Sequence, residues 1–195
     1  LGSWVMMLSL LSGFVFIGPL LAIALYTISW QLELGRVPTF DLSVRTARDR
    51  LGDSMVFALV LLVIFLVWAR AGSMVHVFFP TESRPEIIQL VRFLAIGSAV
   101  GSIFAAIAFA ASAFSLPMLV DRKVDTITAV ISSANAALRN KPAMAVWLGL
   151  IVVLTGVGFA TAFVGLVVLF PLLGHATWHA YRETIDASAW PTHDH

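Results

Sequence analysis

Long stretches without a charged residue alternate with short charged segments along this chain. Trp4 to Ile28 is one such stretch, and Ala143 to Tyr181 is another, 39 residues without Asp, Glu, Lys or Arg. A helix of about 20 apolar residues, rising about 1.5 Å per residue, crosses the hydrocarbon core of a bilayer. The first stretch therefore predicts one crossing. The second predicts two crossings joined by a tight turn near Ala160 to Gly165.

Composition supports the bilayer as the solvent. The chain is 59% hydrophobic and 12% charged, whereas soluble domains are about 25% charged. Two further apolar runs, Ser54 to Ala69 and Phe93 to Val120, bring the prediction to an all-α integral membrane protein with about five transmembrane helices. The net charge of +1 argues against a nucleic-acid partner, which needs a basic face. The absence of cysteine excludes disulfides and thiolate metal sites.

Two of the charged segments have amphipathic patterns. Residues 41–52 place Val44, Ala47 and Leu51 on one helical face, with Asp41 as a candidate N-cap. Residues 124–140 place Ile127, Ile131, Ala134 and Leu138 on one face. Such helices lie in the membrane–water interface, with arginines among lipid phosphates. An ordinary solvated loop helix is the alternative for residues 41–52.

The order helix, surface helix, helix occurs twice, with both copies crossing the bilayer in the same direction. Nine of the 12 Lys and Arg residues lie on the side of the two surface helices and the C-terminus, which predicts that this side is cytoplasmic. The expected organisation begins with a first repeat over residues 1–71, with surface helix 41–52, and an external loop over 72–92. A second repeat plus one helix follows over 93–181, with surface helix 124–140. The chain ends in a cytoplasmic tail over 182–195, in which we expect Trp190 to His195, including His193 and His195, to be solvated. Since the chain starts at Leu1 without a charged n-region, we expect an N-terminal part to be missing.

The third apolar run carries a helix-packing pattern. Gly97, Gly101 and Ala105 recur every four residues, and so do Ser98 and Ser102. Small residues at this spacing let helix backbones approach closely in lipid. The pattern predicts a helix–helix contact, either with a partner subunit or within this chain.

Two constellations are candidates for chemistry. His175 and His179 are four residues apart on one helical face and are therefore candidate metal or haem ligands, although interfacial histidines bonded to headgroups have the same pattern. Asp121 and Arg122 begin the second charged segment, and Tyr181 and Arg182 end the last apolar run on the same predicted side. This cytoplasmic junction is either a gate or partner contact, or an Asp that caps the surface helix beside an Arg that binds phosphate.

Two phrases resemble a known family. Ser115 to Arg122 reads SLPMLVDR, and Pro171 to Arg182 reads PLLGHATWHAYR. Both are similar to a family of predicted bacterial integral membrane proteins of unknown function, some of which are labelled putative cytochrome c oxidase subunits. The resemblance implies a bacterial inner-membrane location and association with respiratory complexes. It implies no catalytic residues, and a haem–copper catalytic subunit needs more histidines within its helices.

These observations favour a protein that is not an enzyme, because no nucleophile motif or phosphate loop is present. The first hypothesis is a non-catalytic accessory or assembly subunit of a larger respiratory or energy-transducing membrane complex, in contact with lipids and other subunits and without a cofactor. The second is a small-molecule or lipid transporter, although no Asp, Glu, Lys or Arg lies deep in an apolar run to mark an ion path. The third is haem or metal binding through His175 and His179.

Overall fold

The computed structural model describes residues 2–78 and 87–193, and within these ranges the chain forms helices and no strands. The prediction of an all-α integral membrane protein is confirmed. The helices are α1 (Gly2–Glu33), α2 (Phe40–Asp49), α3 (Leu51–Phe78), α4 (Ile87–Ser112), α5 (Ser115–Asp121), α6 (Thr126–Arg139), α7 (Lys141–Ala160) and α8 (Leu166–Thr184).

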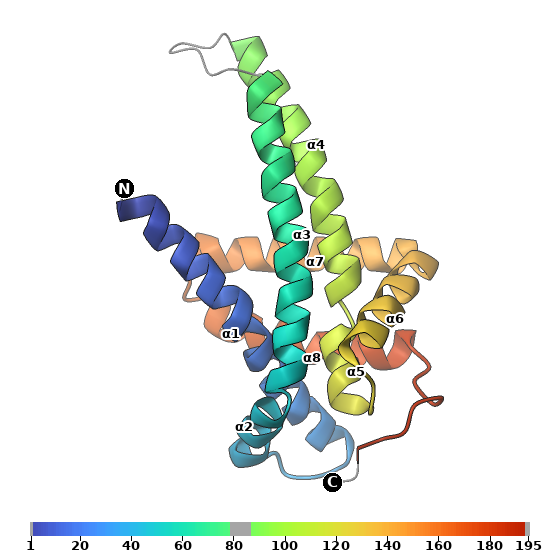
Figure 1. Cartoon of the computed structure of the whole chain (residues 1–195). Coiled ribbons are helices and arrows are strands. Elements are labelled where there is room, and N and C mark those ends of the chain that lie inside the picture. Colours follow the sequence, from blue (N-terminus) through green and yellow to red (C-terminus); the bar gives the residue numbers. More distant parts are fainter. Residues whose placement is uncertain (1, 79–86, 194–195) are drawn as a thin grey trace.

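Two helical hairpins extend from a common base. The base holds α2, α5, α6 and the C-terminal segment, while the α3–α4 hairpin and the α7–α8 hairpin leave it in different directions (Figure 1). Helix α1 packs against both α3 and α8, and so joins the two hairpins. Helix α7 runs across the α3–α4 hairpin (Figure 1), so the two hairpins cannot both stand close to the normal of one flat bilayer.

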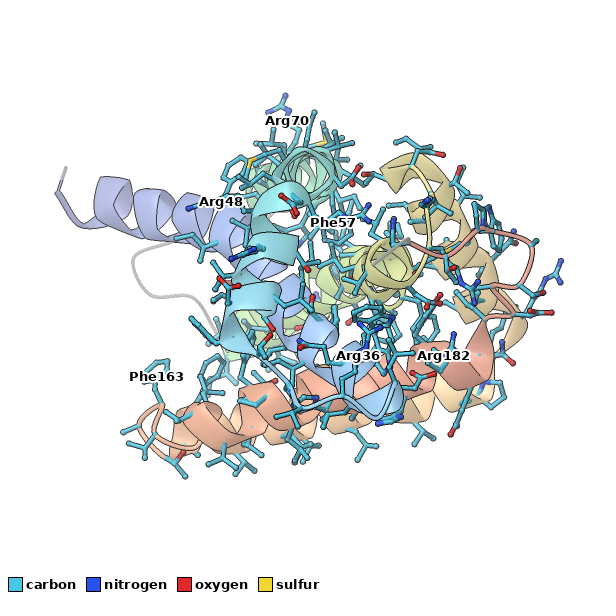
Figure 2. The ribbon with its side chains drawn as sticks, turned by 90° about the horizontal axis from the view of Figure 1, so that it is seen from below. Arg36, Arg48, Phe57, Arg70, Phe163 and Arg182 are labelled. Carbon is cyan, nitrogen blue, oxygen red and sulfur yellow. The ribbon has the colours of Figure 1, made fainter. Side chains whose placement is uncertain are left out.

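In the described ranges, four segments are long and apolar enough to cross a membrane: Phe16–Glu33, Leu51–Met74, Ile87–Asp121 and Lys141–Ala160. The expected fifth crossing, in α8, is not among them, because the second half of this helix carries two histidines, Arg182 and Glu183. Helix α8 nevertheless runs back from the far end of α7 to the base. Phe163 and Arg182 lie at opposite ends of this run (Figure 2). If α7 crosses the bilayer, α8 must return.

The turn between α7 and α8 lies where the sequence predicts it, at residues 161–165. Ala162 and Phe163 have positive φ angles of 53° and 69°, a conformation that costs non-glycine residues free energy. Gly158 and Gly165 allow the two helices to approach closely, because a Cβ built on Gly165 would lie 3.3 Å from the Cα of Gly158.

The hairpin α3–α4 differs from the prediction at its outer end. Helix α3 begins at Leu51 and continues to Phe78, and α4 begins at Ile87. The predicted external loop over 72–92 therefore starts and ends in helix, because Arg70 and Arg92 do not interrupt helical backbone hydrogen bonding. The rest of that loop, residues 79–86, lies outside the described residues.

The third apolar run is not one helix, and the prediction of an uninterrupted helix from Phe93 to Val120 is wrong. The chain turns at Ala113–Phe114 between α4 and α5. The side chain of Ser133 from α6 bridges the break, donating to the carbonyl of Ala110 at 2.7 Å and accepting from the N–H of Phe114 at 3.0 Å. Pro117 lies in the first turn of α5, where its missing N–H costs little.

Helix α6 turns its small residues inward and its large apolar residues outward. Ala129, Ser133, Ala136 and Ala137 are buried, whereas Ile127, Ile131 and Leu138 are between 52% and 62% exposed. A soluble amphipathic helix buries its largest apolar side chains. The reversed arrangement in α6 fits a helix whose outer face meets lipid.

Helix α2 also packs through a polar face. Ser43 and Thr46 are buried, while Phe40 and Val44 are exposed. Buried Gln31 of α1 donates to Ser43 at 3.4 Å and accepts from the N–H of Thr39 at 2.9 Å. The prediction that Asp41 caps this helix is wrong. Thr39 occupies the N-cap position, and Asp41 pairs with Arg45 at 2.9 Å on the surface.

Candidate functional site

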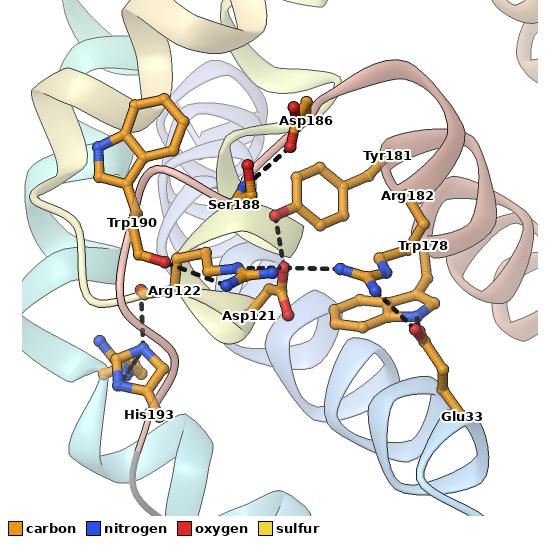
Figure 3. Close-up of polar contacts among 11 residues, drawn as sticks. Glu33, Asp121, Arg122, Trp178, Tyr181, Arg182, Asp186, Ser188, Trp190 and His193 are labelled. Carbon is orange, nitrogen blue, oxygen red and sulfur yellow. Dashed lines mark hydrogen bonds and ion pairs between the residues drawn. The ribbon is translucent and has the colours of Figure 1, made fainter.

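The four predicted junction residues come together at the base, around the carboxylate of Asp121. Asp121 ends α5 and is 7% exposed. One of its oxygens, Oδ2, accepts from the hydroxyl of Tyr181 at 2.8 Å, from Arg182 at 3.1 Å and from the neighbouring Arg122 at 3.0 Å (Figure 3). A buried carboxylate is tolerated only when charges and hydrogen bonds compensate it. The junction is thus a closed polar cluster.

Arg182 extends this cluster to α1. Its other terminal nitrogen pairs with Glu33 at 2.9 Å, and the indole N–H of Trp178 donates to the same carboxylate at 2.8 Å. Trp178 and Tyr181 are fully buried, and their rings pack with centroids 5.9 Å apart. Two arginines therefore balance two carboxylates and fix the ends of α1, α5 and α8 to one another.

Glu33 and Trp178 are site residues that sequence reasoning missed. Glu33 is the first acidic residue after the long uncharged run, and Trp178 lies three residues before Tyr181. The three-residue spacing of Trp178 and Tyr181 places both aromatic rings on the face of α8 that carries the junction. That spacing was the available signal for Trp178, but no local pattern connects Glu33 with Arg182.

The C-terminal segment packs against this cluster, and the prediction that His193 is solvated is wrong, because His193 is partly buried there. Arg122 donates to the carbonyl of Trp190 at 3.0 Å, and the N–H of Lys123 donates to Pro191 at 2.9 Å. His193 contacts the carbonyl of Arg122 at 2.7 Å and the guanidinium of Arg50 at 2.8 Å. His195 lies outside the described residues.

The carboxylates around the base have defined partners. Helix α6 is capped by Asp125, whose carboxylate accepts a hydrogen bond from the N–H of Thr128 at 2.9 Å. The hydroxyl and N–H of Thr128 lower the pKa of Asp125. In the same way, Ser188 lowers the pKa of Asp186, and this pair lies beside the junction (Figure 3). Asp121 does not cap α6, because its carboxylate is directed into the junction.

His175 and His179 line one pocket, together with Ser29, Leu32, Glu33 and Arg182. The Nδ1 of His175 lies 2.6 Å from the hydroxyl of Ser29, and His179 is exposed. Within the described ranges, no group of three or more His, Cys, Asp or Glu side chains is placed to hold a metal ion. Two histidines alone are an incomplete metal site.

The two small-residue rows of α4 have different surroundings. Gly101 faces α3, where a Cβ built on it would lie 3.7 Å from the indole nitrogen of Trp68, and Ala105 lines the same α3–α4 hollow. A Cβ on Gly97 meets nothing within 4 Å. Ser98 and Ser102 are exposed, and the hydroxyl of Ser102 donates to the carbonyl of Ser98 at 2.8 Å. The chain thus covers Gly101, while Gly97 and the row of Ser98 and Ser102 have no neighbouring helix within the described residues.

Comparison with known families matches residues 6–121 to a family described as predicted integral membrane protein (DUF2189). The chain belongs to this family. The match to DUF2189 includes the Ser115–Asp121 phrase and covers α1 to α5, whereas the second phrase, Pro171 to Arg182, lies beyond it. No curated protein and no solved structure matches the chain.

This DUF2189 chain also has an apolar cavity of about 550 Å³ between α1, α7 and α8. Its volume is within the range of about 300–1,000 Å³ typical of small-molecule sites. Most of the lining is aliphatic or aromatic, and Tyr26, Thr155 and Thr177 contribute the hydroxyl groups.

Proposed function

We propose that this protein is a non-catalytic accessory or assembly subunit of a larger membrane complex. The observation that carries the proposal is the exposed row of Ser98 and Ser102 on α4. In the neighbouring row, Gly101 already packs on α3. A helix in lipid gains stability when small and hydroxyl-bearing residues meet another helix, through close packing and interhelical hydrogen bonds.

The position of this row favours contact with another protein. The α3–α4 hairpin extends away from the base (Figure 1), so a partner helix can lie along α4 without displacing α1 or α8. Large exposed apolar residues flank the serines, Leu94 at 54% and Ile103 at 61% exposure. Because serine side chains are small, a partner helix can approach the backbone of α4 closely between these bulky residues.

The junction supports a structural role for the base. Its carboxylates, arginines and aromatic hydroxyl are directed at one another, with Asp121 and Tyr181 buried. Charged groups that are mutually paired and desolvated hold a fixed geometry. A base fixed in this way can keep the α3–α4 and α7–α8 hairpins in one fixed orientation relative to a partner protein.

We further propose a complex of respiratory, cytochrome oxidase type, in a bacterial inner membrane. The support is the resemblance at Ser115 to Arg122 and Pro171 to Arg182 to proteins of which some are labelled oxidase subunits. Both phrases contribute to the junction, through Asp121 of one and Tyr181 of the other. The basic residues on the base side support a cytoplasmic orientation of the base.

The experiment is purification of the tagged protein from its native membranes in mild detergent, followed by mass spectrometry of the co-purifying subunits. We expect Ser102→Leu to reduce recovery of the partner. Ser73→Leu is the matched control, because Ser73 is an exposed serine on α3 that donates to Ala69 at 2.9 Å in the same way. Recovery of the protein alone, or equal effects of the two substitutions, would contradict the proposal. Recovery with a partner outside the respiratory chain would contradict its finer part.

A further inference from the structure

The cavity between α1, α7 and α8 is elongated along α8. Its lining begins at Phe163 in the hairpin turn and ends at Thr177. The helical part of this lining, from Leu166 to Thr177, is about 16 Å long at about 1.5 Å per residue. Phe159 and Phe163 pack edge to face at the turn end, with ring centroids 5.3 Å apart.

The two ends of the cavity differ in chemistry. The turn end is lined by Phe159, Phe163 and Leu166. At the base end lie Tyr26 and Thr177, while Thr155 lies partway along α7. Tyr26 is 8% exposed and lines the cavity. An apolar channel with hydroxyls at one end matches a molecule with a hydrocarbon tail and a polar end.

The backbone at the turn end holds the aromatic lining in place. Ala162 and Phe163 both have positive φ, and residues held in this region require support from their surroundings. The hydroxyl of Thr161 supplies such support, accepting from the N–H of Gly165 at 2.9 Å. This strained turn places Phe163 at the cavity.

We propose that this cavity holds the hydrocarbon tail of one membrane lipid, with the polar part of the lipid toward Tyr26 and Thr177. Helices α1 and α7 both contain segments suited to cross the membrane, so the molecules that reach the space between them are lipids. An unfilled apolar cavity forfeits dispersion contacts along its walls, and a hydrocarbon chain restores them. The inference rests on the cavity alone and does not depend on the accessory role.

The test is native mass spectrometry of the full chain, reconstituted in vesicles of phosphatidylethanolamine and phosphatidylglycerol and then extracted in mild detergent. We expect an adduct of one lipid on the wild type. Ala22→Trp and Thr155→Phe fill the cavity from α1 and α7 and should each lower the adduct about tenfold, since a tenfold loss needs only about two buried methylene groups. Ala106→Trp, on the exposed face of α4, is the control and should retain the adduct.

Three results would overturn the proposal: no adduct on the wild type, an undiminished adduct on both filled variants, or an equal loss from Ala106→Trp. If one filled variant does not give a monodisperse, helical protein, the other decides. Loss of the adduct from the filled variants with unchanged recovery of a partner protein would support the lipid site separately from the accessory role.

Discussion

The hydroxyl of Ser133 accepts a hydrogen bond from the N–H of Phe114 at 3.0 Å and so stabilises the point where α4 stops and α5 begins. Both residues are buried. Ser133→Ala leaves the Phe114 N–H and the Ala110 carbonyl without this partner, and an unsatisfied buried donor costs about 1–3 kcal/mol. We expect a loss of that size in the free energy of unfolding in detergent. Ser132→Ala is the control, and an equal effect there would refute the role of Ser133.

Asp121 is expected to be the most sensitive residue of the junction. Asp121→Asn leaves Arg122 and Arg182 without their shared carboxylate, and breaking a buried ion pair costs about 3–5 kcal/mol. The comparison is Asp41→Asn, which removes an exposed pair with Arg45 worth about 0–1 kcal/mol. Asp121→Asn should therefore lower the melting temperature clearly more than Asp41→Asn does. Similar melting temperatures would mean that the junction does not hold α5 to α8.

The cap of α6 should make its stability depend on pH. Thr128 lowers the pKa of Asp125 below its ordinary value of 3.8, so the unfolded chain binds the proton more tightly than the folded one. The stabilisation is therefore complete above pH 3.8 and is lost as the pH falls through the lower, folded pKa. Amide exchange in α6 should accelerate in that acid range. Asp125→Ala should cost about 1 kcal/mol at neutral pH and should remove this acid dependence; an unchanged acid response in the variant would exclude Asp125 as its source.

The outer face of α6 should lie in lipid. The chain has no cysteine, so a single introduced cysteine can carry a polarity-sensitive dye. In vesicles, a dye on Ile131→Cys should report an apolar surrounding, because Ile131 is 58% exposed from the protein. A dye on Ser132→Cys, the next residue and about 100° round the same helix, should report a more polar one. Equal emission from both sites would argue against an in-plane orientation.

The sequence was sufficient for the membrane character and for the α7–α8 turn, because uncharged runs and clustered glycines are local features. It was not sufficient to show which helix the Ala–Ser stripe of α6 packs against, because that contact joins segments far apart in the sequence. The structure shows that this stripe packs on α4, through the contact of Ser133 with Ala110.

The pairing of distant residues also lay beyond sequence reasoning. Asp121, Arg122, Tyr181 and Arg182 could be singled out from their positions beside apolar runs. Their contact with Glu33 depends on how α1 and α8 pack, and Glu33 is 149 residues from Arg182. The helix break at Phe114 is likewise stabilised by a serine 19 residues away.

The central claim is that α2, α6 and the C-terminal segment share one membrane face, while the α7–α8 turn lies on the other. Single cysteines at Arg48, Asn135, Ser188 and Val164, all exposed positions, can be tested with a membrane-impermeant thiol reagent on oriented membrane vesicles. The account predicts that the first three react from the same side and Val164 reacts only from the opposite side. Labelling of Val164 from the side of the other three, or a split among those three, would contradict it.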